Sequence, residues 1–534
     1  MADNITRSLH TLTVDLVYHI LDKLDRLTIL LSLRNVCTSL NTIIDTYHPY
    51  KTFNELMLTW ESIPAQNIQQ LANAFHNNTT LTMLNLYSNE IDEEGAQYLA
   101  QALQNNTTLT TLELRYNKIG IKGAQYMAQA LQNNTTLTTL NLAFNGIHDE
   151  GIQHLAQALQ NNRTLTKLIL QYNEIHDEGA QYLAQALQNN TTLTTLDLSY
   201  NKIGVEGTQY IARTLQNNTA LTTLNLWFNE IGNEGTQYLT QALQNNMTLT
   251  TLDLGGNDID FNGIQYLTQT LQNNKTLSSL TLGSSNIGTS GAQYLAEALQ
   301  NTTTLTMLNL ESSNIDSVAA QYLAQGLQNN TTLTELNLHY NKIGDEGLEY
   351  LARAFQNNTT LTTLNLALNE ISARGAQHLS QALQNNTTLI TLDLSRNQIL
   401  TEGAQYLAQA LQNNNTLKIL RLELGHIGSK GTQYLAQVLQ HNNTLTTLDL
   451  AHNLIDDEGS QYVAKALEYN TTLTELDVGG NEISADGAEY LARALQKNTT
   501  LITLKIDGNR ISVEEAKHLF HERYHFDYQM AYPR

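Results

Sequence analysis

A repeat of 28 residues accounts for most of this sequence. The segment LTMLNLYSNEIDEEGAQYLAQALQNNTT begins at Leu81, and similar segments follow at steps of 28 residues, without an insertion, as far as Leu501. A fixed period of this length is the signature of a solenoid, in which each unit packs only against its two neighbours. We therefore expect one long repeat domain rather than the three or four domains that 534 residues would otherwise suggest.

Each unit is predicted to contain one short strand and one helix. Leu112 and Leu114 alternate with polar residues, as in a strand that has one buried face. Ala124, Met127 and Leu131 are spaced by three and four residues and place one apolar stripe on a helix. Neither element can bury its apolar surface alone, so stacked units are expected to share one continuous core.

An asparagine recurs between the strand and the helix of most units. Its buried amide can bond backbone groups of its own loop and of the next coil, which explains why each turn needs it. It stands at residues 89, 117, 145, 173, 201, 229, 257, 341, 369, 397, 453, 481 and 509. Ser285, Ser313 and Gly425 replace it, and the first two lie in adjacent units. We therefore expect residues 277–332 to be the weakest part of the array.

The motif LxxLxLxxNxI, followed by GAxxLAxAL at a period of 28 residues, resembles that of the ribonuclease-inhibitor-like leucine-rich repeats. The resemblance covers residues 53 to about 528, which hold about seventeen units. It implies an α/β fold, a leucine-rich-repeat horseshoe solenoid with a parallel sheet inside and helices outside. It also implies a binding scaffold. The expected divisions are a degenerate first unit at 53–80, a capping unit at 501–528 closed by Phe520, Tyr524, Phe526 and Tyr528, and a tail at 529–534.

Residues 1–52 do not follow the period. Leu16, Ile20 and Leu24 are spaced by four residues, which predicts a helix, and further short apolar helices are expected before residue 52. Two or three helices in such a short segment form only a thin core, so the segment requires support from the repeats or from a partner.

This N-terminal segment resembles an F-box, although Thr13 stands where that family has a proline. The residues that follow the family pattern include Leu12, Asp15, Leu16, Ile20, Leu24, Leu27 and Val36. The resemblance implies that these residues bind the Skp-type adaptor of a cullin-type ubiquitin ligase. The alternative is a helical module that only caps the first repeat.

Composition excludes several classes of protein. With 28 Lys and Arg against 50 Asp and Glu, the net charge of -22 argues against binding to nucleic acid or to anionic membranes. A single Cys excludes a disulfide scaffold or a multi-cysteine zinc site. No apolar run approaches the roughly 20 residues of a transmembrane helix, and the N-terminus does not read as a signal peptide. We expect a cytoplasmic protein, with the nucleus as a second location.

No catalytic, cofactor-binding or metal-binding constellation is expected. His148 and His176 occupy equivalent positions in adjacent units, and each is followed by Asp-Glu. Strand neighbours lie about 4.8 Å apart, so such a pair could in principle hold a divalent ion. A pair of solvated turns is the preferred interpretation, and the chain is not expected to be an enzyme.

An exposed row of aromatic residues is predicted on the concave face. Five consecutive units carry an aromatic residue directly before the recurring asparagine, and carboxylates stand in the nearby strands. These five are Tyr116, Phe144, Tyr172, Tyr200 and Phe228; the predicted row also includes Trp60 of the first unit and Trp227, one residue earlier in its unit, with Glu113, Asp197 and Asp253 in the strands. A contiguous row of exposed aromatics is typical of an interface, and the alternative is a stack that only stiffens the edge.

These features favour a substrate-recognition subunit of an SCF-like, cullin-type ubiquitin ligase. The F-box-like segment would bind the adaptor, and the concave face would bind a target protein, which is expected to be basic because the inner wall is acidic. The alternative is a free-standing leucine-rich-repeat scaffold, sensor or inhibitor that resembles NOD-like-receptor or ribonuclease-inhibitor repeats.

Overall fold

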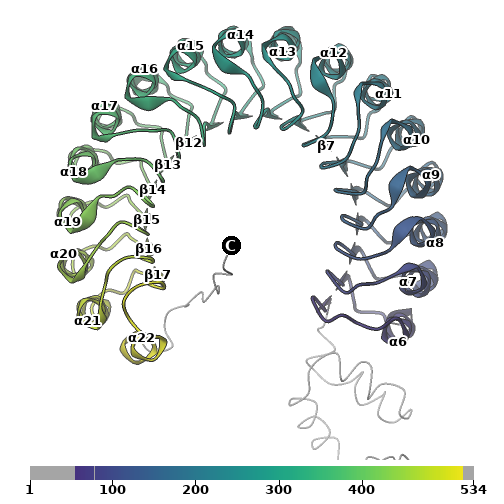
Figure 1. Ribbon diagram of the computed structural model, residues 1–534, viewed down its shortest axis with the longest axis horizontal. Coiled ribbons are helices and arrows are strands. Elements are labelled where there is room, and N and C mark those ends of the chain that lie inside the picture. Colours follow the sequence, from purple (N-terminus) through teal and green to yellow (C-terminus); the bar gives the residue numbers. More distant parts are fainter. Residues whose placement is uncertain (1–53, 77, 521–534) are drawn as a thin grey trace, which may run out of the picture. The chain divides into compact units, whose positions relative to one another are not determined.

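The computed structural model describes residues 54–76 and 78–520, which form two compact units divided between Asp253 and Leu254. In each unit a three-residue strand alternates with a helix. The strands lie on the inner side and the helices lie on the outer side (Figure 1). Each unit is thus an α/β leucine-rich-repeat solenoid. The expected F-box-like module at 1–52, and Tyr524, Phe526 and Tyr528 of the expected cap, lie outside the described residues.

The first unit contains strands β1 (Glu55–Met57), β2 (Met83–Asn85), β3 (Thr111–Glu113), β4 (Thr139–Asn141), β5 (Lys167–Ile169), β6 (Thr195–Asp197), β7 (Thr223–Asn225) and β8 (Thr251–Asp253). Its helices are α6 (Ala65–His76), α7 (Glu93–Asn105), α8 (Gly120–Asn133), α9 (His148–Leu159), α10 (Asp177–Leu187), α11 (Val205–Leu215) and α12 (Gly232–Leu243).

The second unit contains strands β9 (Ser279–Thr281), β10 (Met307–Asn309), β11 (Glu335–Asn337), β12 (Thr363–Asn365), β13 (Thr391–Asp393), β14 (Ile419–Arg421), β15 (Thr447–Asp449), β16 (Glu475–Asp477) and β17 (Thr503–Lys505). Its helices are α13 (Phe261–Asn273), α14 (Gly288–Asn301), α15 (Ser317–Gln328), α16 (Gly344–Asn357), α17 (Ala373–Leu383), α18 (Leu400–Leu411), α19 (Gly428–Leu439), α20 (Asp457–Leu467), α21 (Ala485–Leu495) and α22 (Val513–Phe520).

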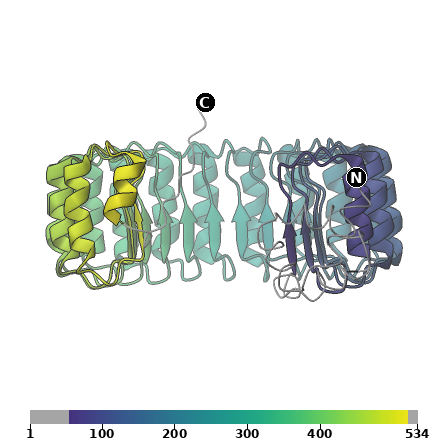
Figure 2. The same ribbon diagram turned by 90° about the horizontal axis from the view of Figure 1, so that it is seen from below.

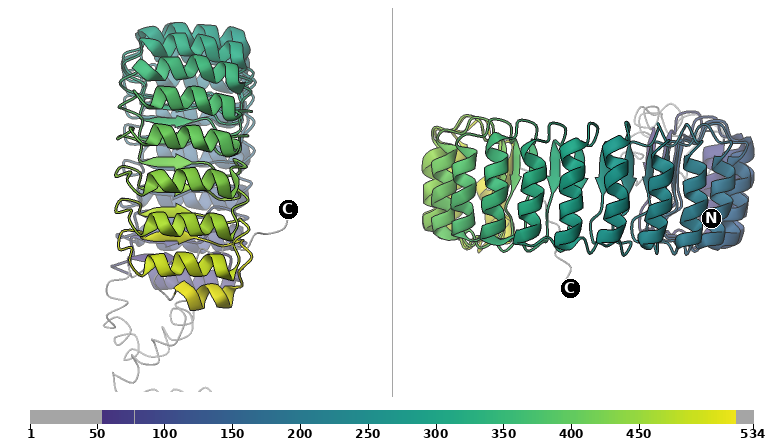
Figure 3. Two further views of the ribbon diagram at one scale, coloured as in Figure 1. Left: turned by 90° about the vertical axis from the view of Figure 1, so that its left-hand side faces the viewer. Right: turned by 90° about the horizontal axis from the view of Figure 1, so that it is seen from above.

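Within each unit the strands form one parallel sheet, and each strand pairs with the next at an offset of one repeat. Leu112 of β3 lies opposite Leu84 of β2 and Leu140 of β4, and the same register holds along the second unit. Figure 2 shows neighbouring strands running in the same direction, and Figure 3 shows the helices of the second unit side by side on its outer face. The strict register keeps every repeated position in one line.

The core contains the residues that the periodicity predicts. Leu112 and Leu114 of the strand segment and Ala124, Met127 and Leu131 of α8 are each at most 1 % exposed. The apolar stripe of each helix therefore packs against the inner sheet, and neighbouring coils continue the same core. No helix in the described part of the chain is long and apolar enough to cross a bilayer.

The recurring asparagine ties each coil to the coil before it. The Nδ2 of Asn117 donates to the carbonyls of Leu86 (3.0 Å) and Leu114 (2.9 Å). Its Oδ1 accepts from the backbone N–H groups of Asn89 (3.0 Å) and Ile91 (2.9 Å). The sequence predicted bonds to the next coil. The structure shows that they run to the preceding coil, because the side chain points back along the stack.

A second buried asparagine per coil was not predicted as a cross-coil ladder. The Nδ2 of Asn106, which directly follows α7, donates to the carbonyl of Phe75 (2.8 Å) in the preceding coil. Its Oδ1 accepts from the N–H groups of Thr108 (3.0 Å) and Leu109 (2.7 Å), which turn the chain into the next strand. The repeated Asn-Thr-Thr sequence is thus explained by this turn.

A carboxylate from one coil also caps the helix of the next. The Oδ1 of Asp149 accepts from the N–H groups of His176 (2.8 Å) and Gly179 (3.0 Å) at the start of α10. A Cβ atom on Gly179 would collide with this carboxylate and with Ile175, which explains the recurring glycine. Asp345 repeats the arrangement with the N–H groups of Ser372 and Gly375.

The two adjacent coils that have Ser285 and Ser313 in place of the recurring asparagine form fewer hydrogen bonds at this position than coils with the asparagine do. The Oγ of Ser285 is buried and makes no hydrogen bond. The Oγ of Ser313 reaches the carbonyls of Leu282 (3.3 Å) and Glu311 (3.1 Å), but a hydroxyl has a single donor where the amide has two.

Of the residues expected to cap the last coil, Phe520 lies in the described part of the chain. It belongs to α22 at the end of the second unit and is buried.

Candidate interaction surface

The predicted aromatic residues of the first unit lie in one line, on the loops that follow the strands. We call Trp60, Tyr87, Tyr116, Phe144, Tyr172, Tyr200, Trp227 and Phe228 the aromatic row. Tyr116 and Phe144 are stacked with ring centroids 4.0 Å apart, and Phe144 and Tyr172 at 4.4 Å. Tyr200 stacks on Phe228 at 4.9 Å, and Tyr172 meets Tyr200 at 6.2 Å with tilted rings.

Two residues that precede the main position by one residue complete this row. Ser88 interrupts the line of aromatics, but Tyr87 meets Trp60 edge-on at 5.1 Å and Tyr116 at 5.6 Å. Trp227 makes edge contacts with Tyr200 (5.2 Å) and with its neighbour Phe228 (5.1 Å). The rings therefore form an unbroken series from Trp60 to Phe228, and Tyr87 is a member that the predicted site omitted.

The backbone does not require an aromatic residue at these loops. The residue before the recurring asparagine has a left-handed φ in every coil, from 50° at Phe228 to 69° at Gly508. A bulky side chain in this region costs about 1 kcal/mol relative to glycine. Gly256 occupies the position with a φ of 65°. The aromatic side chains are therefore present despite the local backbone preference.

Much of the row remains open to solvent. Trp60 is 69 % exposed and Tyr172 is 52 % exposed, while Phe144 and Tyr200 are half-buried between their neighbours. Stacking within the row accounts for part of the ring surface, as the stiffening interpretation requires. The exposed remainder is apolar area that a partner can cover.

Arg115 adds a positive charge to the row, which the sequence interpretation missed. Its guanidinium carbon lies 5.2 Å from the ring centroids of both Tyr116 and Phe144, within the range of a cation–π contact. Its Nε is buried without a hydrogen-bond partner. Burial raises the pKa of the nearby Glu113 carboxyl, while a hydrogen bond from Asn141 and the charges of Lys167 and Arg115 lower it.

The predicted acidic residues therefore do not make a simple acidic wall in the first unit. Glu113 is half-buried, and Asp197 accepts from the N–H (2.9 Å) and the hydroxyl (2.6 Å) of Ser199. Asp253 is half-buried at the end of the first unit. Glutamates beside the row are paired across coils, as Glu90 is with Lys118 at 2.9 Å. The local charge around the row is mixed.

A more acidic inner surface lies in the second unit. Asp393, Asp449 and Asp477 occupy the same position in β13, β15 and β16. The pKa of Asp449 is raised to about 6, mainly by burial and also by the charges of Asp477, Glu423 and Asp393, while a hydrogen bond from the N–H of Ala451 lowers it. Burial also raises the pKa of Asp477, which the nearby Lys505 partly offsets.

Each histidine of the pair in the first unit lies close to a carboxylate of a neighbouring coil. The Nδ1 of His176 lies 3.2 Å from the Oδ2 of Asp149, and the Nδ1 of His148 lies 3.9 Å from the Oε2 of Glu174. Lys202 shares Glu174 at 3.4 Å. In the described ranges, no group of three or more His, Cys, Asp or Glu residues is arranged to hold a metal ion.

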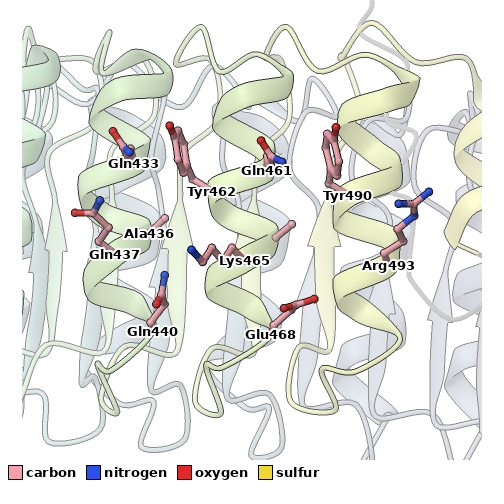
Figure 4. A pocket seen from close by; sticks show the side chains of 11 residues that line it. Gln433, Ala436, Gln437, Gln440, Gln461, Tyr462, Lys465, Glu468, Tyr490 and Arg493 are labelled. Carbon is pink, nitrogen blue, oxygen red and sulfur yellow. The ribbon is translucent and has the colours of Figure 1, made fainter.

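Grooves between helices on the outer face recur with the repeat. Figure 4 shows one of about 490 Å³ beside α19, α20 and α21, with Lys465, Glu468 and Arg493 among its side chains. Glu468 is paired with Lys497 at 2.8 Å, and Arg493 is paired with a glutamate of its own helix. A similar groove of about 350 Å³ lies beside α18 and α19. Their recurrence gives no reason to single out one of them as a site.

The expected adaptor-binding residues lie outside the described residues: Leu12, Asp15, Leu16, Ile20, Leu24, Leu27 and Val36.

The sequence interpretation missed one exposed aromatic residue in the second unit. Tyr340 occupies the loop position of the aromatic row, and the register of 28 residues points to it. It is 59 % exposed in the second unit.

Two families of repeats match the chain. The TMOD/LMOD Leucine-rich domain matches residues 115–232. The Leucine Rich repeat matches 77–100, 245–267, 273–296, 329–352, 357–380, 385–408, 413–436, 441–464 and 469–492. Among solved structures, the chain is similar to one described as "Crystal structure of Rad7 and Elc1 complex in yeast", with 18% identity, a TM-score of 0.42, and coverage of 71% of this chain and 88% of that one. No curated protein matches the chain significantly.

Proposed function

We propose that this leucine-rich-repeat protein is a target receptor of a cullin-type ubiquitin ligase, with two binding regions on one chain. Residues 1–52 bind a Skp-type adaptor, and the aromatic row of the first unit binds the protein to be ubiquitinated. Repeats of this type are typically interaction scaffolds rather than enzymes, so the contribution to the reaction is placement of the target.

The aromatic row carries the target-binding part of the proposal. Stacked rings from Trp60 to Phe228 combine a rigid arrangement with solvent-exposed apolar area, at a loop position where the backbone favours glycine. Aromatic side chains lose little conformational entropy on binding and dominate interface energies. Arg115 in the middle of the row adds a group that can bond a carbonyl or carboxylate of the target.

The adaptor-binding part depends on the F-box-like pattern in residues 1–52. Leu16, Ile20 and Leu24 would lie on one side of a helix and enter an apolar groove of the adaptor. Binding adaptor and target on one chain raises the local concentration of the target at the ligase. Two moderate affinities are then sufficient for efficient transfer.

A co-precipitation experiment tests the adaptor. The full chain should retain a Skp-type adaptor, and Leu16→Lys with Ile20→Lys should abolish this, because two unpaired charges would be buried in an apolar groove. Asp22→Lys, on the other side of the expected helix, is the matched control and should retain the adaptor. If the wild type retains no adaptor, or if the double variant retains it, residues 1–52 do not act as an F-box.

The alternative is a free-standing scaffold in which residues 1–52 only cover the first coil. The apolar face of a terminal coil requires a cap, and Leu56 and Leu58 of the first described coil are buried. This alternative predicts that the Leu16→Lys and Ile20→Lys variant lowers the melting temperature of the repeats. Target binding through the aromatic row is common to both versions.

A further inference from the structure

A groove of about 440 Å³ lies along four consecutive loops of the second unit, those that follow β10, β11, β12 and β13. Tyr340 and Leu368 provide apolar surface in it, and Lys342, Glu370 and Arg396 provide charge. Tyr340 is 59 % exposed and Leu368 is half-buried. The groove lies entirely within the second unit and involves none of the aromatic row.

Two charges of this groove lack the partner that the repeat supplies elsewhere. At the equivalent position of other coils, a cation pairs with a glutamate one coil earlier: Lys118 with Glu90 at 2.9 Å, Lys202 with Glu174 at 3.4 Å, and Arg510 with Glu482 at 3.0 Å.

Lys342 follows Asn314 instead of a glutamate, and Glu370 is followed by Gln398 instead of a cation. Neither Lys342 nor Glu370 forms an ion pair within the part of the chain that the structure describes. Arg396, by contrast, is paired with Glu423 at 3.2 Å. The groove therefore presents one available cation and one available anion on adjacent loops.

The series of recurring asparagines to which Asn117 belongs, here called the asparagine ladder, is also altered beneath this groove. In several other coils the N–H of the ladder asparagine donates to the side chain of the next one, as the N–H of Asn369 does to Asn397 (3.0 Å). At Asn341 the N–H bonds the carbonyl of Leu368 (3.1 Å), and the Oδ1 of Asn369 is buried without a hydrogen-bond partner. The loops that carry Tyr340 and Leu368 thus depart from the repeat where its charges are unpaired.

We propose that this groove binds a short extended segment of a partner protein, in which a carboxylate side chain and a basic side chain flank an apolar residue. The carboxylate pairs with Lys342, the basic group with Glu370, and the apolar residue covers Tyr340 and Leu368. Neighbouring loops are about 4.8 Å apart, so four loops span roughly 15 Å, which is about four or five extended residues. This site is separate from the proposed target surface.

A random seven-residue peptide library displayed on phage tests this proposal on the full chain. Selection on the wild type should enrich sequences with an acidic and a basic residue around an apolar one. Selection on the charge-swapped variant Lys342→Glu with Glu370→Lys should enrich the opposite order of charges. A synthetic peptide from the first selection should bind the swapped variant at least about 10-fold more weakly than the wild type.

The matched control swaps a pair that is already satisfied, Glu174→Lys with Lys202→Glu, and should leave peptide affinity unchanged. Tyr340→Ala should weaken the peptide, whereas Tyr340→Phe should keep it, and melting curves of each variant identify any loss of folding. The proposal is overturned if no peptide is enriched, if both selections yield the same sequences, or if the peptide is insensitive to Tyr340→Ala in a folded protein. None of these outcomes depends on adaptor binding or on the aromatic row.

Discussion

The two units share one backbone but differ in what they display on it. The loop position before the ladder asparagine has a left-handed φ in both units, yet the first unit fills it mainly with stacked aromatics. The second unit fills the same position with Gly256, Ser284, Ser312, Tyr340, Leu368, Arg396, Leu424, His452, Gly480 and Gly508. The fold therefore restricts the residue type at the leucine and asparagine positions but not at this loop position. The stacked aromatics of the first unit are thus held together by contacts between their own side chains.

The largest expected difference between the units is in target binding. Tyr172→Ala with Tyr200→Ala should reduce affinity for the target by at least about 10-fold, since central aromatic residues dominate interface energies. The melting temperature should stay close to that of the wild type, because Tyr172 is 52 % exposed. Affinity purification with mass spectrometry, followed by titration of the recovered partner, measures the effect.

The second unit provides a control for this experiment at the same loop position. Leu424→Ala should leave target affinity unchanged, and so should substitutions at Gln384 and Gln412 on the outer side. If the double tyrosine variant melts earlier and binds as before per folded molecule, the row is a structural stack and not a binding site.

The asparagine ladder should reveal a difference in stability between the units. Asn201→Ala removes bonds from Nδ2 to Leu170 (3.1 Å) and Leu198 (2.9 Å), and its Oδ1 no longer accepts from Asn173 (3.0 Å). The buried backbone groups lose their partners, so the free energy of unfolding should fall by about 2–3 kcal/mol. Chemical denaturation followed by circular dichroism measures this loss.

In the second unit the reverse change, Ser285→Asn, should raise the free energy of unfolding by about 1 kcal/mol, which the same denaturation experiment measures.

Hydrogen exchange measures the stability of individual coils. The strand amides that exchange fastest in the wild type should lie in residues 279–313, because neighbouring coils open together where bonds are missing. Uniform protection through the central coils would contradict a weak point here.

Stability of the second unit should depend on pH through Asp449. Its pKa of about 6 lies above the ordinary value of 3.8, so the folded protein holds the proton more tightly than the unfolded chain does. Stability should therefore rise as the pH falls from 7 towards 5, by about 1 kcal/mol after allowance for solvent screening. Asp449→Asn should flatten this part of the pH profile, whereas Asp197→Asn in the first unit should leave it in place.

The smallest expected effect concerns the left-handed loop itself. Tyr172→Gly should be more stable than Tyr172→Ala by about 0.5–1 kcal/mol, because glycine adopts a positive φ without steric cost. Leu424, with a φ of 53° in the second unit, should give the same order. At the neighbouring Gln171, which is not among the left-handed residues, alanine should be the more stable replacement. Equal stabilities of the glycine and alanine variants at Tyr172 would show that the left-handed loop carries no strain.

The repeated core was predictable because each coil shows its pattern directly. The spacing of Leu112, Leu114 and Met127 was sufficient to place strand, helix and core, and the register predicted one line from Tyr116 to Phe228. Contacts between coils were less visible, because the partners are a whole repeat apart in the sequence. The cap from Asp149 to α10 and the contacts of Arg115 with Tyr116 and Phe144 therefore emerged only from the structure.

Because the same bonds recur at most junctions, whole coils can be added or removed while the neighbouring coils still fit together. Removal of residues 144–171 joins Ala143 to Tyr172, keeps the bond from the N–H of Tyr116 to the carbonyl of Ala143 (3.0 Å), and places Tyr172 where Phe144 stacked. A deletion of 27 or 29 residues instead leaves one coil a residue too long or too short, so the loop and helix of that coil lose their match to both neighbours. Recombination between copies of the repeat can thus lengthen or shorten the binding surface in whole coils, and selection then acts on the exposed loop residues alone.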